Sequence, residues 1–249
     1  MSERRVPYEN AYMADYGFER DMVFARQRTI VELIDSLKPR SVVELGCGDD
    51  LLVSKSHAGS IKQWIIIEPA EGFAARARER VASDPRCSVI ESIAEDATAA
   101  VRAHLPGGAD LVVCSSLLHE VDAPARLLGA CRAMLAPSGT CHINVPNALS
   151  FHRRLARTMG LVRSEYEPSA RNLALAQPSL FDRQSLRALV EANELEVAND
   201  GGYFVKPFTH VQMELARSIL TDKVLEGLWS LGRELPDLAS EIFVNVKLQ

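Results

Sequence analysis

A short apolar run that ends in a glycine turn is the first part of this sequence with the residue types to bind a small molecule. The run spans residues 42–48 and reads Val-Val-Glu-Leu-Gly-Cys-Gly. A turn leaving a parallel strand must adopt positive φ, and Gly46 and Gly48 let the backbone approach a ligand with no Cβ in the way. Glu68 follows 20 residues after Gly48, where a carboxylate can accept hydrogen bonds from both hydroxyls of a ribose. The pattern indicates a nucleoside cofactor at the carboxyl edge of an α/β sheet.

The elements that would position these residues alternate along the first 150 residues. A helix is expected over about 20–37, and helical stretches separate the apolar runs that follow it. The expected strands are 41–45, 64–68, 88–91, 110–115 and 140–145. The runs 65–67 and 111–113 are continuously apolar, as in strands covered on both faces. This alternation predicts right-handed βαβ units and a parallel sheet.

The second half of the chain has a different pattern. A helix near 148–159 leads to a polar stretch over 164–179, which is interpreted as a mobile lid or as a pair of helices. Asp182 is expected to cap the next helix, and Asp122 to cap an earlier one. A strand over 196–205, two helices and a final strand over 241–248 complete the chain. In the second of those helices an apolar stripe is expected at Val224, Leu228, Leu231 and Leu235.

The composition excludes several classes of protein. Apolar residues make up 47% and charged residues 24%, the balance of a globular protein. The net charge of −5 argues against a nucleic-acid partner, which requires a concentrated basic face. No run has membrane-spanning length or resembles a secretory signal, so neither a membrane partner nor export is expected. Five cysteines without a Cys-x-x-Cys pair favour a reducing compartment and no metal cluster. The expected location is cytoplasmic, and the expected state is a monomer or a homodimer.

Four segments, in order, resemble motifs of the class I S-adenosylmethionine-dependent methyltransferases. Residues 44–48, Glu-x-Gly-x-Gly, resemble the first motif, and Glu68 matches the acidic residue of the second. Residues 109–121 are similar to the fourth-strand motif. Residues 127–139 look like the helix and turn before the fifth strand. One departure is Asp50, which stands where the family often has a third glycine, so the contact to the methionine part of the cofactor is open to change there.

The resemblance implies an α/β fold with a seven-stranded, mostly parallel Rossmann-like sheet and helices on both faces. The last two strands are expected as an antiparallel pair at one edge. Residues 1–249 are expected to form one methyltransferase domain, with 1–19 as an N-terminal lid. Residues 148–193 and 207–235 are expected to form a helical cover over the substrate.

The resemblance also implies S-adenosyl-L-methionine as the cofactor. The backbone from Gly46 through Cys47 to Gly48 would lie against its methionine and ribose portions, and Glu68, followed by Pro69, would hold the ribose hydroxyls. Ile93 and Ala94 would flank the adenine, although core packing is an equal interpretation for Ile93. The carbonyl of Cys114 or Ser115 would receive the methionine ammonium. Glu44 either orients the amides of the glycine loop or is only a carboxylate within the strand.

Three histidines that follow expected strands are candidates for a catalytic base, which is needed when the acceptor must lose a proton early. His119 is the first choice, with a capping or packing role as the alternative; His152 and His210 are the others. Residues expected to line the substrate pocket are Asn147, Phe204, Phe208 and Tyr16. Core packing competes for the two phenylalanines. Tyr16 with Tyr8 and Tyr12 would form a lid, or be disordered without ligand.

The predicted function is methyl transfer to a small-molecule acceptor, at a hydroxyl oxygen, by in-line displacement. The extra helices would enclose a pocket, and residues 114–117 replace the Asn-Pro-Pro-Tyr signature of some amino- and base-methylating relatives. One alternative is an NAD(P)-dependent oxidoreductase, but the third glycine of its fingerprint would fall at Leu51. The other is a protein that binds S-adenosylmethionine without catalysis.

Overall fold

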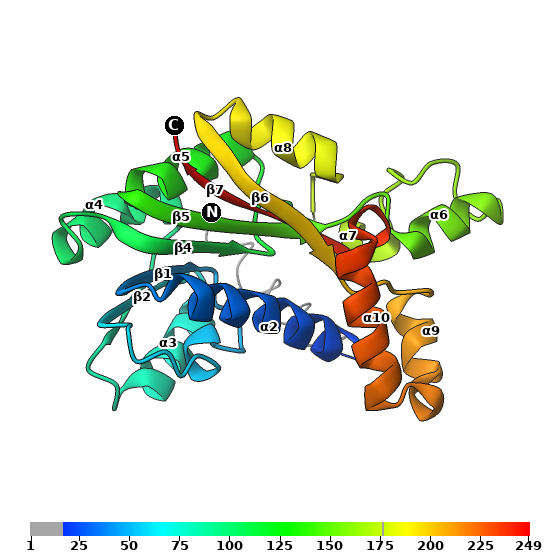
Figure 1. Cartoon of the computed structure of the whole chain (residues 1–249), viewed down its shortest axis with the longest axis horizontal. Helices are drawn as coiled ribbons and strands as arrows, with labels where there is room; N and C mark the ends of the chain where they lie inside the picture. Colours follow the sequence, from blue (N-terminus) through cyan, green and yellow to red (C-terminus); the bar gives the residue numbers. More distant parts are fainter. Residues whose placement is uncertain (1–16, 176) are drawn as a thin grey trace.

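The computed structural model describes residues 17–175 and 177–249 (Figure 1). Its centre is a seven-stranded sheet of order β3-β2-β1-β4-β5-β7-β6. The strands are β1 (Ser41–Leu45), β2 (Gln63–Ile67), β3 (Cys87–Ile90), β4 (Ala109–Ser115), β5 (Leu135–Pro146), β6 (Leu195–Tyr203) and β7 (Glu241–Leu248). The first five run parallel, and β7 is antiparallel to both β5 and β6. The predicted fold class is confirmed.

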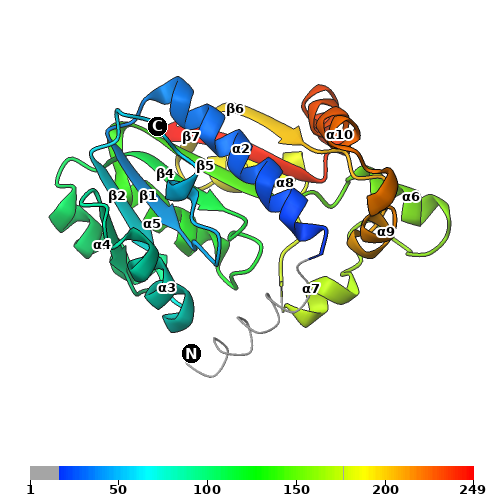
Figure 2. The same ribbon diagram turned by 90° about the horizontal axis from the view of Figure 1, so that it is seen from below.

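Helices cover both faces of this sheet (Figures 1 and 2). They are α2 (Glu19–Leu37), α3 (Glu71–Val81), α4 (Ala94–His104), α5 (Pro124–Met134), α6 (Phe151–Thr158), α7 (Ala170–Ala174), α8 (Arg183–Glu191), α9 (His210–Leu215) and α10 (Asp222–Glu234). Successive strand residues face opposite sides: Val42 packs with α2 and α3, whereas Val43 packs with α4, α5 and α8. Both faces are therefore dry, which explains the continuous apolar runs.

Three local predictions were wrong. Between β1 and β2 the chain forms only a 3₁₀ turn, η2 (Leu52–Ser54), where a helix was expected. The segment 56–60, Ser-His-Ala-Gly-Ser, is rich in turn-forming residues and offers no helical apolar face. Asp122 does not cap α5: the helix begins at Pro124 after Ala123, without a side-chain cap. β5 begins earlier than expected because Leu135 already pairs with Ala109 ahead of a bulge.

The helices of the second half follow the expected order along the chain, and α10 buries a different face from the one predicted. Asp182 caps α8 through a capping box with Ser185, as predicted. Phe181 and Leu186 are both buried at this helix start. The polar stretch over 164–179 contains the short helix α7.

In α10 most of the predicted apolar stripe faces outward, whereas Leu228 is half-buried and packs against the core. Val224, Leu231 and Leu235 are 42%, 36% and 44% exposed. The buried residues are Trp229 and Gly232, because a glycine is needed where the helix passes against the Phe204 backbone. The inward face is therefore rotated from the stripe that the leucine spacing indicated.

The carboxyl ends of the parallel strands define one edge of the sheet, and β6 ends at the same edge. Tyr203, the last residue of β6, pairs with Glu241 of β7, which also pairs with Pro146 at the end of β5. Helices α6, α7 and α9 gather at this end in both views (Figures 1 and 2). No helix in the described part of the chain is long and apolar enough to cross a membrane.

Candidate active site

The glycine turn after β1 has the conformation that its sequence requires. Gly46 has φ +68° and Gly48 has φ +55°, both in the left-handed region that favours glycine. The Gly46 amide donates a hydrogen bond to the Ile67 carbonyl at 2.8 Å, which fixes the turn to the end of β2. The predicted turn is confirmed, and it places an open stretch of main chain at the carboxyl edge of the sheet.

Glu68 lies directly against this turn. Its side chain is buried, with Oε2 accepting from the Gly48 amide at 3.2 Å and Oε1 accepting from the Ala70 amide at 2.9 Å. The Sγ of Cys47 lies 3.7 Å from Oε2. Burial and the Glu68 charge raise the pKa of the Cys47 thiol, so this thiol stays neutral. Pro69 is half-buried beside this carboxylate.

Glu44 orients the chain that follows the turn. Its Oε1 accepts from the Leu52 amide at 3.2 Å and its Oε2 accepts from the Trp64 indole at 2.9 Å. Burial raises the pKa of Glu44 to about 7, against the lowering effect of these hydrogen bonds. Of the two interpretations of Glu44, the loop-orienting one is favoured by these contacts.

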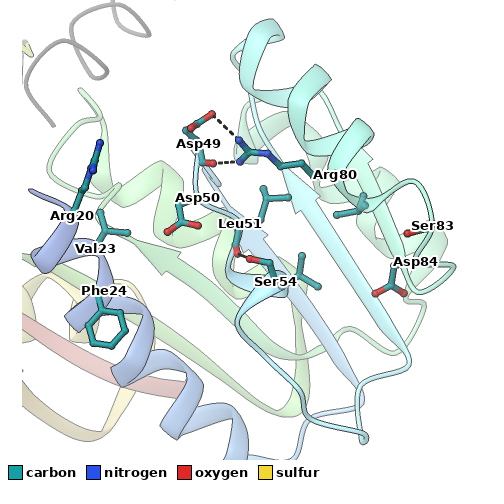
Figure 3. Close-up of a pocket in the computed structure, with 12 residues that line it drawn as sticks. Arg20, Val23, Phe24, Asp49, Asp50, Leu51, Ser54, Arg80, Ser83 and Asp84 are labelled. Atoms are coloured by element: carbon teal, nitrogen blue, oxygen red, sulfur yellow. Dashed lines mark hydrogen bonds and ion pairs between the residues drawn. The ribbon is translucent and has the colours of Figure 1, made fainter.

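A hollow of about 850 Å³ lies beside the loop after the turn (Figure 3). It opens between α2, the Asp49–Ser54 loop and the end of α3, and Arg80 reaches across to Asp49. Arg76 also pairs with Asp49, at 2.9 Å. None of the predicted cofactor contacts lines this hollow. It is therefore a neighbour of the expected cofactor site and not the site itself.

The end of β4 packs over the glycine turn. Cys114 is fully buried and Ser115 is half-buried, and the next residue, Ser116, has φ +54°. This turn directs Leu117 toward Gly46: a Cβ placed on that glycine would lie 3.5 Å from a Leu117 methyl. At the end of β3, half-buried Ile93 is the N-cap residue of α4, and Ala94 is buried in the apolar core. The predicted cofactor residues thus come from four neighbouring strand ends.

His119 follows Leu117 by two residues and is buried, with 4% of its surface exposed. Its Nδ1 makes no hydrogen bond to any described residue, and its Nε2 lies 3.8 Å from a Glu120 oxygen. Burial, reinforced by the Arg26 charge, lowers the pKa of His119 to about 3. The ring is therefore neutral at physiological pH, and a weak proton acceptor in this environment.

His152 and His210 lie at the same end of the sheet. His152, near the start of α6, has Nδ1 3.2 Å from the Ser150 hydroxyl; burial and then the Lys206 charge hold its pKa well below the usual value. His210 begins α9, with Nε2 3.2 Å from Glu19 Oε2 and Nδ1 3.3 Å from the Lys206 ammonium. The predicted histidines of three separate segments are thus brought to one region.

The predicted substrate residues differ in burial and in the contacts that they make. The Asn147 side chain donates to the Asp237 and Ala239 carbonyls and accepts from the Leu149 amide, so its contacts favour a structural role. Phe204 is buried, with φ +61°, and packs edge-on against Phe18, which favours the core interpretation. Phe208 is 46% exposed. Tyr16, together with Tyr8 and Tyr12, lies outside the described residues.

Sequence reasoning missed a buried polar network beneath these histidines. The guanidinium of Arg26 on α2 pairs with Glu241 of β7 and with Glu19. The hydroxyl of Tyr203 donates to Glu241 at 2.5 Å, and the Asn144 amide donates to it at 2.8 Å. Arg26 is one of several charged residues in α2, so no signal in the sequence would single it out or pair it with Glu241.

Comparison with known proteins identifies the class. Residues 21–199 match the family model described as a methyltransferase domain. The chain therefore belongs to this family and is a class I S-adenosylmethionine-dependent methyltransferase. The match supports this class over a nicotinamide-dependent oxidoreductase. A 115-residue segment is 33% identical to a ubiquinone biosynthesis O-methyltransferase of Bordetella pertussis, and this alignment spans 44% of each chain.

Solved structures share the fold at low sequence identity. A possible histamine N-methyltransferase of Thermotoga maritima aligns with a TM-score of 0.58 and 17% identity, covering 98% of this chain and 99% of the other. The plantazolicin methyltransferase BamL, solved with SAH, gives 0.54 and 13%, covering 100% and 98%. The [4+2]-cyclase SpnF gives 0.54 and 13%, covering 89% and 81%. Because one fold carries these different activities, the acceptor must be inferred from the site itself.

Proposed function

We propose that this enzyme transfers the methyl group of S-adenosylmethionine to a hydroxyl oxygen of a small-molecule acceptor. The observation that carries the proposal is a group of polar side chains beyond the glycine turn, of which His119 and Lys206 are buried and His210 is half-buried. His119, His210 and Lys206 come from the segments after β4 and β6, at the edge where Leu117 contacts the turn. The partial similarity to a protein named as an O-methyltransferase is consistent with oxygen as the acceptor atom.

The residues around the turn fit the cofactor. Gly46 and Gly48 present main chain without Cβ atoms, and the Glu68 carboxylate lies against the same turn, where it would accept hydrogen bonds from the ribose hydroxyls. Ile93 with Ala94 would contact the adenine, and the Cys114 or Ser115 carbonyl would accept from the methionine ammonium. When bound, the cofactor supplies a methyl group that is already activated, because its sulfonium sulfur leaves as a neutral thioether.

The remaining work of the protein is to orient the acceptor and exclude water. The segments 148–193 and 207–235 would enclose the acceptor as a helical cover. Alignment of this kind can lower a barrier by roughly 7–11 kcal/mol when the geometry is near attack. The buried Nδ1 of His119 would form a hydrogen bond with the acceptor oxygen and orient it, and it would not act as the base because its pKa is lowered.

The test is to incubate the full-length protein with cell extracts and cofactor carrying a ¹³C-labelled methyl group. Carbon NMR of the products separates methoxy carbons from methyl groups on nitrogen or carbon. We expect labelled methoxy product with the wild type and none with Glu68→Ala. Label found only in N-methyl or C-methyl groups would contradict an oxygen acceptor while leaving the methyltransferase class intact.

A further inference from the structure

Lys206 is a buried lysine in the region proposed for the acceptor. It follows β6 by three residues, and 4% of its surface is exposed. Its amide donates to the Ser240 hydroxyl at 3.0 Å, which fixes the segment beside the start of β7. Lysine is almost never this buried unless it is paired. Lys206 therefore places a buried ammonium at this edge of the sheet.

The charged groups around Lys206 form a connected set. The Lys206 ammonium lies 3.3 Å from Nδ1 and 3.5 Å from Nε2 of His210, whose Nε2 lies 3.2 Å from Glu19. Glu19 in turn accepts from Arg26 at 3.3 Å. The titratable and charged groups facing this region are Glu19, Arg26, His119, Glu120, His152, Arg153, Tyr203, His210 and Glu241.

Two of the neighbouring histidines respond to nearby positive charges, His152 to Lys206 and His119 to Arg26. After burial, the Lys206 charge is the largest cause that holds the pKa of His152 below its usual value. The Arg26 charge acts in the same direction on His119. A cation that disfavours a second positive charge favours a negative one at the same place.

We propose, building on the oxygen-directed methyl transfer above, that Lys206 stabilises the acceptor hydroxyl in its ionised form and that the acceptor is a phenol or an enol. On binding, the acceptor O–H bond breaks, the proton goes to bulk water, and both electrons remain on oxygen as the nucleophile. No protein side chain has to accept that proton. His119, whose ring is neutral, then donates a ring N–H to the oxygen, and His210 lies beside Lys206.

The magnitude of the electrostatic effect selects the acceptor class. An opposite charge within a few ångströms lowers an acid's pKa by about 1–3 units. A phenol, with a pKa of about 10 like tyrosine, becomes substantially ionised near neutral pH after such a shift. An aliphatic hydroxyl, with a pKa near the ~16 of water, stays protonated. A single lysine is therefore sufficient for a phenol and insufficient for an alcohol.

The experiment uses 4-nitrophenol as the probe, because its ionised form absorbs visible light and its neutral form does not. The full-length protein saturated with S-adenosylhomocysteine is titrated with pH in the presence of the probe. We expect the bound probe to ionise about one pH unit or more below the free probe. Lys206→Met should abolish this shift, whereas Lys206→Arg should retain part of it. Lys62→Met, at an exposed position, is the matched control and should behave as wild type.

Cofactor binding by calorimetry and a thermal melt verify that each variant is folded. An unshifted probe, or no binding of the probe by the wild type, would overturn the role of Lys206 and the phenol class. An equal shift in wild type and Lys206→Met would overturn the role of Lys206. The NMR assay tests the proposed function independently of the probe titration. Labelled methoxy product together with an unshifted probe refutes only the role of Lys206 and the phenol class. Label found only on nitrogen refutes the proposed function.

Discussion

Arg26 and Glu241 meet in the protein interior although 215 positions separate them in the chain. The Arg26 Nε lies 3.0 Å from Glu241 Oε2, and both side chains are buried. Tyr203 and Asn144 donate to the same carboxylate. The pair joins the first described helix to the last strand at the sheet edge where we propose that the acceptor binds. Such a pair is tolerated because the added hydrogen bonds offset the cost of removing both charges from water.

Removing one partner of this pair should be strongly destabilising. We expect Arg26→Met to lower the free energy of unfolding by about 3–5 kcal/mol, because Glu241 is left buried without its cation. The double variant Arg26→Met with Glu241→Gln should recover part of the loss. Arg28→Met is the control on the same helix: its partner Glu226 is exposed, so a loss of about 1 kcal/mol or less is expected. Urea unfolding measures the free energy of unfolding of each variant. Equal losses for Arg26→Met and Arg28→Met would refute the stabilising role of the buried pair.

Glu68→Gln should weaken cofactor binding. The neutral amide replaces a charged acceptor of ribose hydrogen bonds and disturbs the contact with the Gly48 amide. Charged hydrogen bonds contribute roughly 1.5–3 kcal/mol each, so the Kd should rise at least about tenfold. Isothermal titration with S-adenosylmethionine is the measurement. Glu71→Gln, exposed in the first turn of α3, should leave the Kd unchanged. A wild-type Kd for Glu68→Gln would remove Glu68 from the site.

Glu44 should give the protein a pH-dependent stability. Its pKa is about 7 in the folded protein, above the ordinary carboxyl value of 4.5, because burial disfavours the carboxylate. The folded state therefore holds this proton more tightly, so its stabilising effect is complete below about pH 4.5 and is lost as pH rises through 7. The change is on the order of 3 kcal/mol.

Glu44→Gln removes this titration, so the unfolding free energy of the variant should change less than that of wild type between pH 4.5 and 8. Chemical denaturation at several pH values measures the difference. Parallel stability curves would show that Glu44 does not titrate in this range.

His119→Ala should lower turnover while leaving cofactor affinity near that of wild type. The loss is expected to be about tenfold, the effect of one orienting hydrogen bond. Because the pKa of His119 is about 3, its ring stays neutral throughout any assay carried out above pH 5. The variant should therefore keep the wild-type shape of the kcat against pH profile. Loss of an ionisation near neutral pH would instead make His119 a general base. Exposed His57→Ala is the control.

Much of the fold could be predicted because it depends on local patterns. The apolar runs of β1 and β7 coincide with the predicted strands, and the Asp182 cap was read from adjacent residues. The missing helix between β1 and β2 shows the limit of expecting strict alternation, since turn-forming residues override it. The exposed leucines of α10 show a second limit, because the spacing of apolar residues predicts a helix but not which face of it will pack. In α10 the packed face is the one that carries Gly232.

By itself, the sequence determined the cofactor turn, because positive φ at Gly46 and Gly48 and an acid at the next strand end are properties of residues close in the chain. The three histidines lie beyond the carboxyl ends of the strands that they were predicted to follow, and their roles stay predictions. Only the tertiary structure decided what surrounds them. Burial made His119 a weak base, and packing set Lys206 beside His210 and Arg26 beside Glu241. These effects depend on desolvation and charge across long separations, which no local pattern encodes.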